Sequence, residues 1–268
     1  MDIKYSDHLL RQAVGEYKPF AIIMMFSGGD DSLATYNILK EIGVKPDFVI
    51  HGRTGTGLTE TTKFAVSQIE KNKDKLLLAD AGNAYENYVL RKGFFGIGGK
   101  AHSYAYHILK HGPFRKIISK EIRKGKRGRR AMLINGARRK ESERRKKTMK
   151  KAIKIDGPNI WVNIINEFSN TDVKEYLSGN NIKRNPVSVA LCKSGECMCG
   201  TMQSHEMRAE AGSFDPCWKN WINNLEKEVM KKHPWKWGEQ INKYHLQEKK
   251  GQLNLFQPMC ENCITENE

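Results

Sequence analysis

The sequence has 268 residues, of which 39% are hydrophobic, and carries a formal net charge of +16. This length allows one α/β domain with a smaller appendage, and it contains no run of about 18 apolar residues that could span a membrane. Residues 1–4 lack the apolar stretch of a signal peptide, so we expect a cytoplasmic protein with no membrane partner.

Short apolar runs alternate with helical patterns in the first 80 residues. The expected elements are strands over 20–26, 47–51 and 75–79 and helices over 33–42 and 59–70. The first run suits a strand that is buried on both faces. Strands and helices in alternation indicate a parallel sheet with right-handed crossovers, and therefore the α/β class.

The later chain is expected to continue this pattern and then to change character. A glycine-rich stretch over 93–100 is followed by the expected elements: helices over 102–110, 169–177 and 214–232 and strands over 131–134 and 159–165. Cysteines, tryptophans and long polar helices dominate after Pro186. We therefore place a domain boundary there, between an α/β domain over 1–186 and a small helical, cysteine-rich region over 187–268.

Almost all of the excess positive charge lies in residues 115–151, which we call the basic tract. It holds 18 Lys and Arg against three Glu, so the rest of the chain is close to neutral. One interpretation is a solvated, partly disordered loop inserted into the α/β domain. The other is a surface that follows the phosphates of a polynucleotide, because cations that neutralise phosphates release counterions. We favour the second, since an enzyme that binds only a nucleotide needs few cations.

The segment Ser27-Gly28-Gly29-Asp30-Asp31-Ser32 has the composition of a phosphate-binding loop. It follows the first expected strand, at the end of a parallel sheet where ligands bind. Its glycines let the backbone N–H groups approach phosphates, its serines supply hydroxyl donors, and the helix that follows directs its positive end at the anion. Asp31 is the expected Mg²⁺ ligand, because Mg²⁺ prefers oxygen ligands that it shares with a nucleotide.

These six residues resemble the PP-loop of the adenine nucleotide α-hydrolase superfamily. Three further segments resemble motifs of its phosphoadenosine phosphosulfate reductase-like branch: His51-Gly52-Arg53-Thr54-Gly55 with Glu60-Thr61, Gly136-Ala137-Arg138-Arg139-Lys140-Glu141-Ser142 with Arg144-Arg145, and Asn185-Pro186. The resemblance spans residues 18–200. It implies a Rossmann-like parallel sheet with helices on both faces, and cleavage of ATP between its α- and β-phosphates.

The resemblance also implies which residues hold ATP. The expected nucleotide-binding residues belong to the loop and to the first two motifs: Ser27, Gly28, Gly29, Asp30, Asp31, Ser32, His51, Arg53, Thr54, Gly55, Gly136 and Arg138. The expected catalytic residues are Asp31, Arg138 and Arg139, because an arginine can clamp a phosphate with two hydrogen bonds. The alternatives are that both arginines belong to a solvated face and that His51 is a core histidine.

The chain departs from the pattern of this branch at two positions. Asp30 stands where many relatives have Lys, and Arg53 stands where relatives often have Asp. We hypothesise that Arg53 supplies part of the missing positive charge. Lys110 resembles a lysine of the branch, but a surface position is the simpler expectation.

All six cysteines follow residue 191. Disulfides are rare in the cytoplasm, so clustered cysteines indicate metal or redox chemistry. Two close pairs supply the four thiolates that zinc or an iron–sulfur cluster requires. The expected ligands of a [4Fe–4S] cluster, which relatives often carry, are Cys197, Cys199, Cys260 and Cys263, with Cys192 and Cys217 as alternates and zinc as the alternative metal. Core packing is the simpler role for Cys217.

Three functions remain open. The favoured one is an ATP pyrophosphatase that adenylates a nucleic acid for sulfur insertion, because the chain resembles the DNA-phosphorothioation ATP pyrophosphatases of the Dnd and Ssp type. That resemblance implies DNA, a sulfur donor such as a cysteine desulfurase, and other modification-system subunits as partners; a tRNA thiolase is a variant with RNA as substrate. The second is a phosphoadenosine phosphosulfate or adenylylsulfate reductase, although no Glu-Cys-Gly-x-His-like segment is present. The third is a non-catalytic nucleic-acid-binding module with a degenerate PP-loop.

Overall fold

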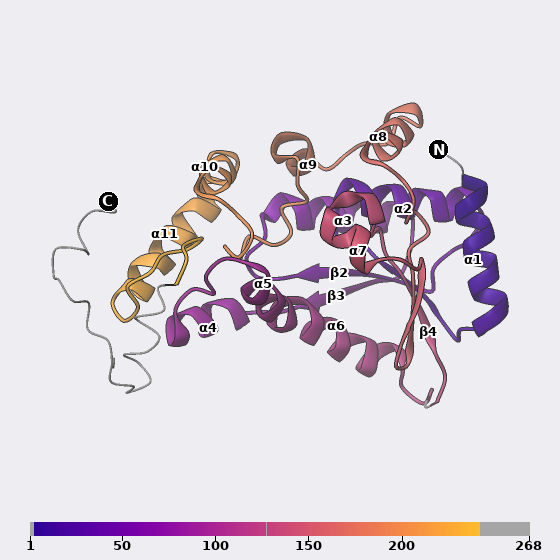
Figure 1. The fold of residues 1–268 in the computed structure, drawn as a ribbon, viewed down its shortest axis with the longest axis horizontal. Coiled ribbons are helices and arrows are strands. Elements are labelled where there is room, and N and C mark those ends of the chain that lie inside the picture. The colour runs from indigo at the N-terminus through magenta and orange to yellow at the C-terminus, as the bar shows by residue number, and fades with distance from the viewer. Residues whose placement is uncertain (1–2, 127, 242–268) are drawn as a thin grey trace.

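A six-stranded sheet forms the centre of the computed structural model, which describes residues 3–126 and 128–241 (Figure 1). The strand order is β3-β2-β1-β4-β6-β5. The strands are β1 (Ile22–Met25), β2 (Phe48–Arg53), β3 (Leu76–Asp80), β4 (Ala131–Ile134), β5 (Ile153–Asp156) and β6 (Asn159–Val162). All neighbouring strands pair parallel except β5, which pairs antiparallel with β6. The sheet confirms the expected α/β, Rossmann-like class, while the antiparallel edge strand β5 was not expected.

The central strands are apolar because both faces of the sheet are covered. All four residues of β4 are fully buried. Met132 and Ile134 face one hydrophobic cluster, and Ala131 and Leu133 face another on the opposite side, as the alternation of side chains along a strand requires. The central sheet position of β4 means that the basic tract contributes part of the core.

One face of the sheet is covered by four helices: α1 (Ile3–Tyr17), α2 (Asp30–Glu41), α3 (Thr59–Lys71) and α8 (Asn170–Gly179). Their buried residues, among them Leu10, Leu39, Phe64 and Leu177, pack together in one cluster with the strands. The helix α1 was not expected from the sequence.

Four helical segments follow one another on the other side of the sheet: α5 (Gly99–Tyr106), η1 (His107–His111), α6 (Gly112–Ile117) and η2 (Ile118–Ile122). The segments η1 and η2 are π-helical turns. Phe114, Ile118 and Ile122 pack against the strands. The basic tract also contains the short helical segments η3 (Arg139–Glu141) and α7 (Glu143–Thr148). The described part of the tract therefore contains a strand and helical segments as well as exposed turns, and the choice between a solvated segment and a polynucleotide surface stays open.

A third hydrophobic cluster joins the later helices to the middle of the chain. The helices α4 (Ala84–Lys92), α9 (Pro186–Leu191), α10 (His205–Phe214) and α11 (Pro216–Met230) surround it. Val89 and Leu109, from before the expected domain boundary, pack here with Trp218 and Trp237 from beyond it. A hydrophobic core thus crosses the boundary that we place near Pro186, and that boundary stays a prediction.

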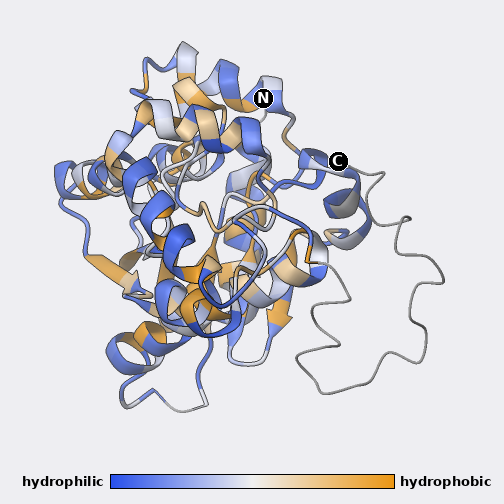
Figure 2. Ribbon diagram, turned by 90° about the vertical axis from the view of Figure 1, so that its left-hand side faces the viewer, coloured by the Kyte–Doolittle hydropathy of each residue, from blue (hydrophilic) through white to orange (hydrophobic). Residues whose placement is uncertain are grey.

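Hydrophobic residues gather on the strands and on the inner faces of the helices, whose outer faces are largely hydrophilic (Figure 2). Within residues 3–126 and 128–241, no helix combines the length and the apolar character needed to cross a membrane.

Candidate active site

The phosphate-binding loop over residues 27–32 lies at the carboxyl end of β1. The helix α2 begins at Asp30, earlier than expected, so Asp30, Asp31 and Ser32 form its first turn. Its N-cap residue is Gly29, which has no side chain to cap the helix. The N-terminus of α2 therefore offers amide donors and the positive end of the helix dipole to an anion.

Hydrogen bonds hold the two serines of the loop together. Ser27 Oγ donates to Ser32 Oγ at 3.0 Å, and Ser32 Oγ donates to the Gly29 carbonyl at 2.9 Å. Both serines line the large cavity described below. The hydroxyls are thus fixed on the side of the loop from which a ligand would approach.

The glycines of the site sit where a side chain would collide with neighbouring protein. Gly28 has a φ of +78°, and a Cβ atom there would lie 3.3 Å from Thr61 Cγ2. A Cβ atom at Gly29 would lie 3.0 Å from Ser194 Cβ, and one at Gly136 would lie 2.6 Å from the backbone carbon of Asp31. Glycine is therefore required at position 136 because the backbones of two protein segments approach each other closely there.

Each acidic residue of the loop pairs with an arginine from a distant segment. Asp31 Oδ1 lies 2.9 Å from Arg138 Nε, and Asp30 Oδ1 accepts a hydrogen bond from Arg184 Nε at 3.1 Å. Burial raises the pKa of Asp31, and Arg138 only partly offsets this effect. The arginines bring balancing positive charge to a helix N-terminus that would otherwise carry two carboxylates.

The structure separates the two arginines that we expect to act in catalysis. Arg138 is only 3% exposed, and its guanidinium also donates to the Phe168 carbonyl and to Asn170 Oδ1. It lines the cavity next to Asp31. Arg139 pairs with Glu167 at 3.6 Å and does not line the cavity. Their catalytic roles stay predictions.

A cavity of about 1630 Å³ extends from the carboxyl ends of the central strands to the turn between β5 and β6. Its walls come from the phosphate loop, the Gly136 motif, the helical segments over 99–122 and a loop that we call the cysteine loop, residues 192–203. The expected site residues that line it are Ser27, Gly29, Asp30, Asp31, Ser32, Gly136, Arg138 and Cys197. The structure thus brings the phosphate loop and one expected cluster ligand into one cavity.

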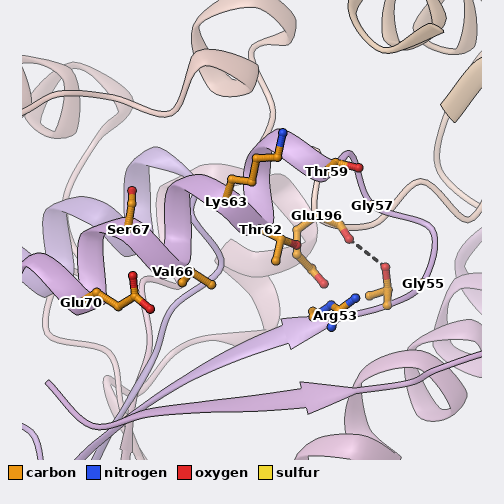
Figure 3. A pocket seen from close by; sticks show the side chains of 11 residues that line it. Arg53, Gly55, Gly57, Thr59, Thr62, Lys63, Val66, Ser67, Glu70 and Glu196 are labelled. Carbon is orange, nitrogen blue, oxygen red and sulfur yellow. Dashed lines mark hydrogen bonds between the residues drawn. The ribbon is translucent and has the colours of Figure 1, made fainter. Parts of the chain in front are cut away.

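The second motif of the nucleotide site lines a different, smaller pocket of about 500 Å³ (Figure 3). Arg53, Thr54 and Gly55 form one wall, and α3 forms the other. Arg53 Nη1 pairs with Asp80 Oδ2 at 3.1 Å. Arg53 therefore lies outside the cavity that the phosphate loop lines, where Arg184 is the cation beside Asp30. The hypothesis that Arg53 supplies part of the missing positive charge stays a prediction.

His51 is a fully buried residue of β2. Its Nδ1 lies 2.9 Å from the Phe26 carbonyl, and burial lowers the pKa of its imidazole. His51 lines neither pocket. Its geometry is that of a core histidine linking the ends of β1 and β2, which was the alternative that the sequence left open.

Cys197 and Cys199 lie side by side in the cysteine loop. Cys199 is buried and Cys197 is partly buried and lines the cavity. A hydrogen bond between the thiols lowers the pKa of Cys199 to about 4 and raises that of Cys197. His102 and Thr201 also favour the Cys199 thiolate. The pair therefore offers one stabilised thiolate, the form that binds metals and attacks sulfur centres.

An ion pair between the partly exposed Lys110 and the buried Glu196 lies beside these thiols. Burial lowers the pKa of Lys110, but Glu196 and Cys197 raise it by more than burial lowers it. The net effect is a raised pKa, so the ammonium stays charged. Lys110 belongs to the π-helical turn η1 and lines the cavity. Lys110 is therefore partly accessible, as expected, but it faces the cavity and is paired with Glu196.

The remaining cysteines divide into three cases. Cys192 is exposed and lines the cavity, while Cys217 is exposed on α11. Core packing for Cys217 is therefore wrong, because α11 buries the face that carries Trp218, Ile222 and Leu225. Cys260 and Cys263 lie outside the described residues. No three His, Cys, Asp or Glu residues come together as a metal site within the part of the chain that the structure describes.

Sequence reasoning missed Arg184 and the Lys110–Glu196 pair. Arg184 follows α8, and its partner Asp30 lies 154 residues earlier in the chain. A single sequence carries no signal for such a pairing. The glutamate directly before Cys197 was a weak signal, since a buried charge beside a thiol pair requires a partner.

The chain matches the family described as phosphoadenosine phosphosulfate reductase domain over residues 21–201. No curated protein sequence matches the chain. Among solved structures, FMN adenylyltransferase from Candida glabrata, in complex with FAD and inorganic pyrophosphate, is similar with a TM-score of 0.50 and 11% identity, over 70% of this chain and 60% of that one.

Two other structures show weaker similarity. Phosphoadenylyl-sulfate reductase from Candida auris has a TM-score of 0.48 and 14% identity, over 68% of this chain and 82% of that one. The U34-tRNA thiolase from Methanococcus maripaludis, with its [4Fe–4S] cluster, has a TM-score of 0.48 and 16% identity, over 85% and 74%. At these identities, structural similarity concerns the fold alone.

Proposed function

The chain belongs to the phosphoadenosine phosphosulfate reductase domain family, and from this premise we propose that it is an ATP pyrophosphatase that adenylates a substrate for sulfur transfer. The observation that carries the proposal is that the phosphate loop and Cys197 line the same cavity. One part of this cavity suits the phosphates of ATP, and the other presents a thiol. An enzyme that activates a substrate with ATP and then delivers sulfur needs both.

The chemistry of the first step follows from the donors at the loop. A substrate oxygen attacks the α-phosphorus of ATP, the bond to the β-phosphate oxygen breaks, and pyrophosphate leaves. The amides at the N-terminus of α2 and the Ser27 and Ser32 hydroxyls stabilise the negative charge of the phosphates. Asp31 Oδ1 faces Arg138, and its other carboxylate oxygen, Oδ2, is the one that we assign to Mg²⁺.

We further propose a nucleic acid, with DNA favoured, as the substrate. Pockets for small ligands usually measure about 300–1,000 Å³, and this cavity is larger, at about 1630 Å³. Cations line it from several elements, including Arg115, Lys174 and Lys193. A wide cavity with cations on separate walls suits a polynucleotide backbone better than a free nucleotide.

The cysteine pair supports a metal cofactor in part. Cys197 and Cys199 fit two positions of a four-thiolate set, because their sulfurs are adjacent and one is a stabilised thiolate. Cys260 and Cys263, outside the described residues, would complete the set for a [4Fe–4S] cluster, with zinc as the alternative. When bound, such a cluster would supply sulfur-binding or electron-transfer chemistry beside the activated substrate. A sulfur donor and partner subunits belong to the same proposal.

A reductase acting on phosphoadenosine phosphosulfate or adenylylsulfate is the second candidate. The description of the matching family favours it. In that case the phosphate loop would hold the nucleotide sulfate, and a cysteine thiolate would attack its sulfur, break the bond from sulfur to the phosphate oxygen and release the nucleotide. Of the pair, Cys197 is the one that lines the cavity.

Pyrophosphate release separates the candidates. The purified protein would be incubated with ATP labelled at the α-phosphate and Mg²⁺, alone and with duplex DNA, single-stranded DNA or tRNA, while AMP and pyrophosphate are measured. We expect a polynucleotide to stimulate their formation. Ser27→Ala should abolish turnover, whereas Ser67→Ala, a matched change on α3, should not. Cys197→Ser should leave ATP cleavage intact, because the thiol acts after adenylation.

A parallel assay would measure sulfite released from phosphoadenosine phosphosulfate in the presence of a thiol reductant. Sulfite formation without any cleavage of ATP would contradict the pyrophosphatase and establish the reductase. The absence of both activities, together with tight polynucleotide binding, would support the non-catalytic module.

A further inference from the structure

The first turn of α2 poses an electrostatic problem for a phosphate-binding site. It places two carboxylates, Asp30 and Asp31, at the helix end that faces the cavity. The helix dipole contributes only about half a positive charge at that end. A polyphosphate would meet net negative charge there unless nearby cations outweigh the two aspartates.

Arg138 does not solve this problem, because its buried guanidinium is directed at groups of the protein itself. Its Nε faces Asp31, and its two terminal nitrogens donate to the Phe168 carbonyl and to Asn170. Its side chain is almost fully buried. Arg138 therefore balances Asp31 and fastens the loop after β4 to the start of α8.

Arg184 differs in each of these respects. It donates hydrogen bonds to Asp30 through Nε and Nη2, while no hydrogen bond from Nη1 is found within the described residues. Its side chain is 32% exposed and lines the cavity beside the loop. The next residue, Asn185, is fully buried and hydrogen-bonded to the phosphate loop, which fixes the backbone from which Arg184 extends.

We infer that Arg184 is the phosphate-binding cation of this loop and that Asp30 is the positioning residue that holds it. The pair joins Asp30, where many relatives have Lys, to a cation from another part of the chain. Arg184 Nη1 would donate to a phosphate oxygen of the nucleotide while Nε and Nη2 stay on Asp30. The inference rests on the proposed binding of ATP at this loop, and it adds a residue that no motif of the sequence assigned.

The test moves the positively charged side chain from position 184 to position 30. Binding of ATP and of inorganic pyrophosphate would be measured by titration calorimetry for the wild type, Arg184→Ala, Arg184→Lys and the double variant Asp30→Lys/Arg184→Ala. Lys183→Ala, which removes the neighbouring cation, is the matched control. Thermal unfolding would be recorded for every variant, and AMP formation would be followed separately.

We expect Arg184→Ala to weaken the binding of both ligands about tenfold to a hundredfold, the range for a lost hydrogen bond to a charged group. Arg184→Lys should bind better than Arg184→Ala. The lysine in the double variant should restore most of the affinity, which a purely structural role of Arg184 would not allow. Lys183→Ala should bind like the wild type.

Two results would overturn the inference. One is equal affinity in the wild type and Arg184→Ala. The other is an Arg184→Ala defect that the lysine at position 30 fails to restore while the double variant remains folded. Both results leave the proposed function standing if AMP still forms. Conversely, a wild type that binds ATP through Arg184 but forms no AMP would refute the pyrophosphatase and keep the inference.

Discussion

The side chain of Asn185 donates a hydrogen bond from Nδ2 to the Gly28 carbonyl at 3.0 Å, across 157 residues of sequence. Its Oδ1 accepts a hydrogen bond from the Val187 amide at 3.0 Å and caps α9. The residue is fully buried. One amide group thus joins the phosphate loop to the segment that carries Arg184 and the cysteine loop, and this dual role requires both a donor and an acceptor.

Asn185→Ala should therefore weaken both the fold and the site. We expect the free energy of unfolding to fall by about 1–3 kcal/mol, because the buried Gly28 carbonyl and the Val187 amide lose their partner. The affinity for ATP should fall as well, since the loop loses an anchor. Urea denaturation and ATP titration measure the two effects.

Asn180→Ala, which removes one hydrogen bond to the Tyr176 carbonyl at the end of α8, is the control and should leave ATP binding unchanged. Equal ATP affinity in the wild type and Asn185→Ala would contradict this account.

Neighbouring arginines should respond very differently to the same change. Arg138→Ala leaves Asp31 partly buried without its ion pair, and breaking a buried pair typically costs about 3–5 kcal/mol. Arg139 is 40% exposed and pairs loosely with Glu167, so Arg139→Ala should cost no more than about 1 kcal/mol. Chemical denaturation of the two variants gives the comparison. Similar losses in both would mean that the burial of Arg138 contributes little.

The contact between Gly136 and α2 leads to a third prediction. A methyl group at Gly136 would lie 2.6–2.8 Å from backbone atoms of Asp31 and Ser32. Gly136→Ala should push the start of α2 away and destabilise the protein by about 1–3 kcal/mol, the usual cost of overpacking. Gly15, inside α1, has no atom within 4 Å of an added methyl group, so Gly15→Ala should stabilise by about 0.5–1 kcal/mol. Thermal unfolding tests both signs, and an unchanged melting temperature for Gly136→Ala would contradict the close approach.

The sheet was largely predictable because its strands carry a local signal. The apolar run over 131–134 coincides with β4, and the run over 20–26 contains β1. The edge strand β5 was missed although Ile153-Lys154-Ile155-Asp156 alternates between apolar and polar residues, because a run of only four residues is too short to distinguish a strand, and three of the four are exposed. The π-helical turns around Gly112 and Pro113 were also missed, since this pair normally indicates a helix end.

The site was predictable at the level of motifs but not at the level of pairing. The phosphate loop is recognisable in the sequence because its six residues are consecutive, and five of them line the cavity. The partners of its aspartates come from segments more than 100 residues away. Such contacts are set by the tertiary packing of α8 against α2 and of α9 against α3, which no local pattern reports. The motif around Arg53 was also visible in the sequence, but its residues line a separate pocket and not the cavity of the phosphate loop.

Residues 124 and 126 allow the polynucleotide hypothesis to be tested without damaging the fold. Arg123 is unsuitable, because its guanidinium donates to the Pro158 carbonyl and to Asn159 and so supports the turn between β5 and β6. Lys124 and Lys126 are exposed, and no ion pair of theirs is found within the described chain. Lys124→Ala/Lys126→Ala should weaken DNA binding and make the slope of log K against log salt less negative by about 0.9 for each phosphate contact removed.

The control for this variant has the same change in charge at another place. Lys71→Ala/Lys227→Ala removes two exposed lysines from the end of α3 and from α11. Fluorescence anisotropy of labelled duplex DNA at several salt concentrations gives both slopes. Since a uniform loss of net charge would shift the two double variants alike, only a larger change at 124 and 126 supports a local interface. Equal slopes would remove the basic tract from the polynucleotide hypothesis and leave the cations of the cavity as its sole support.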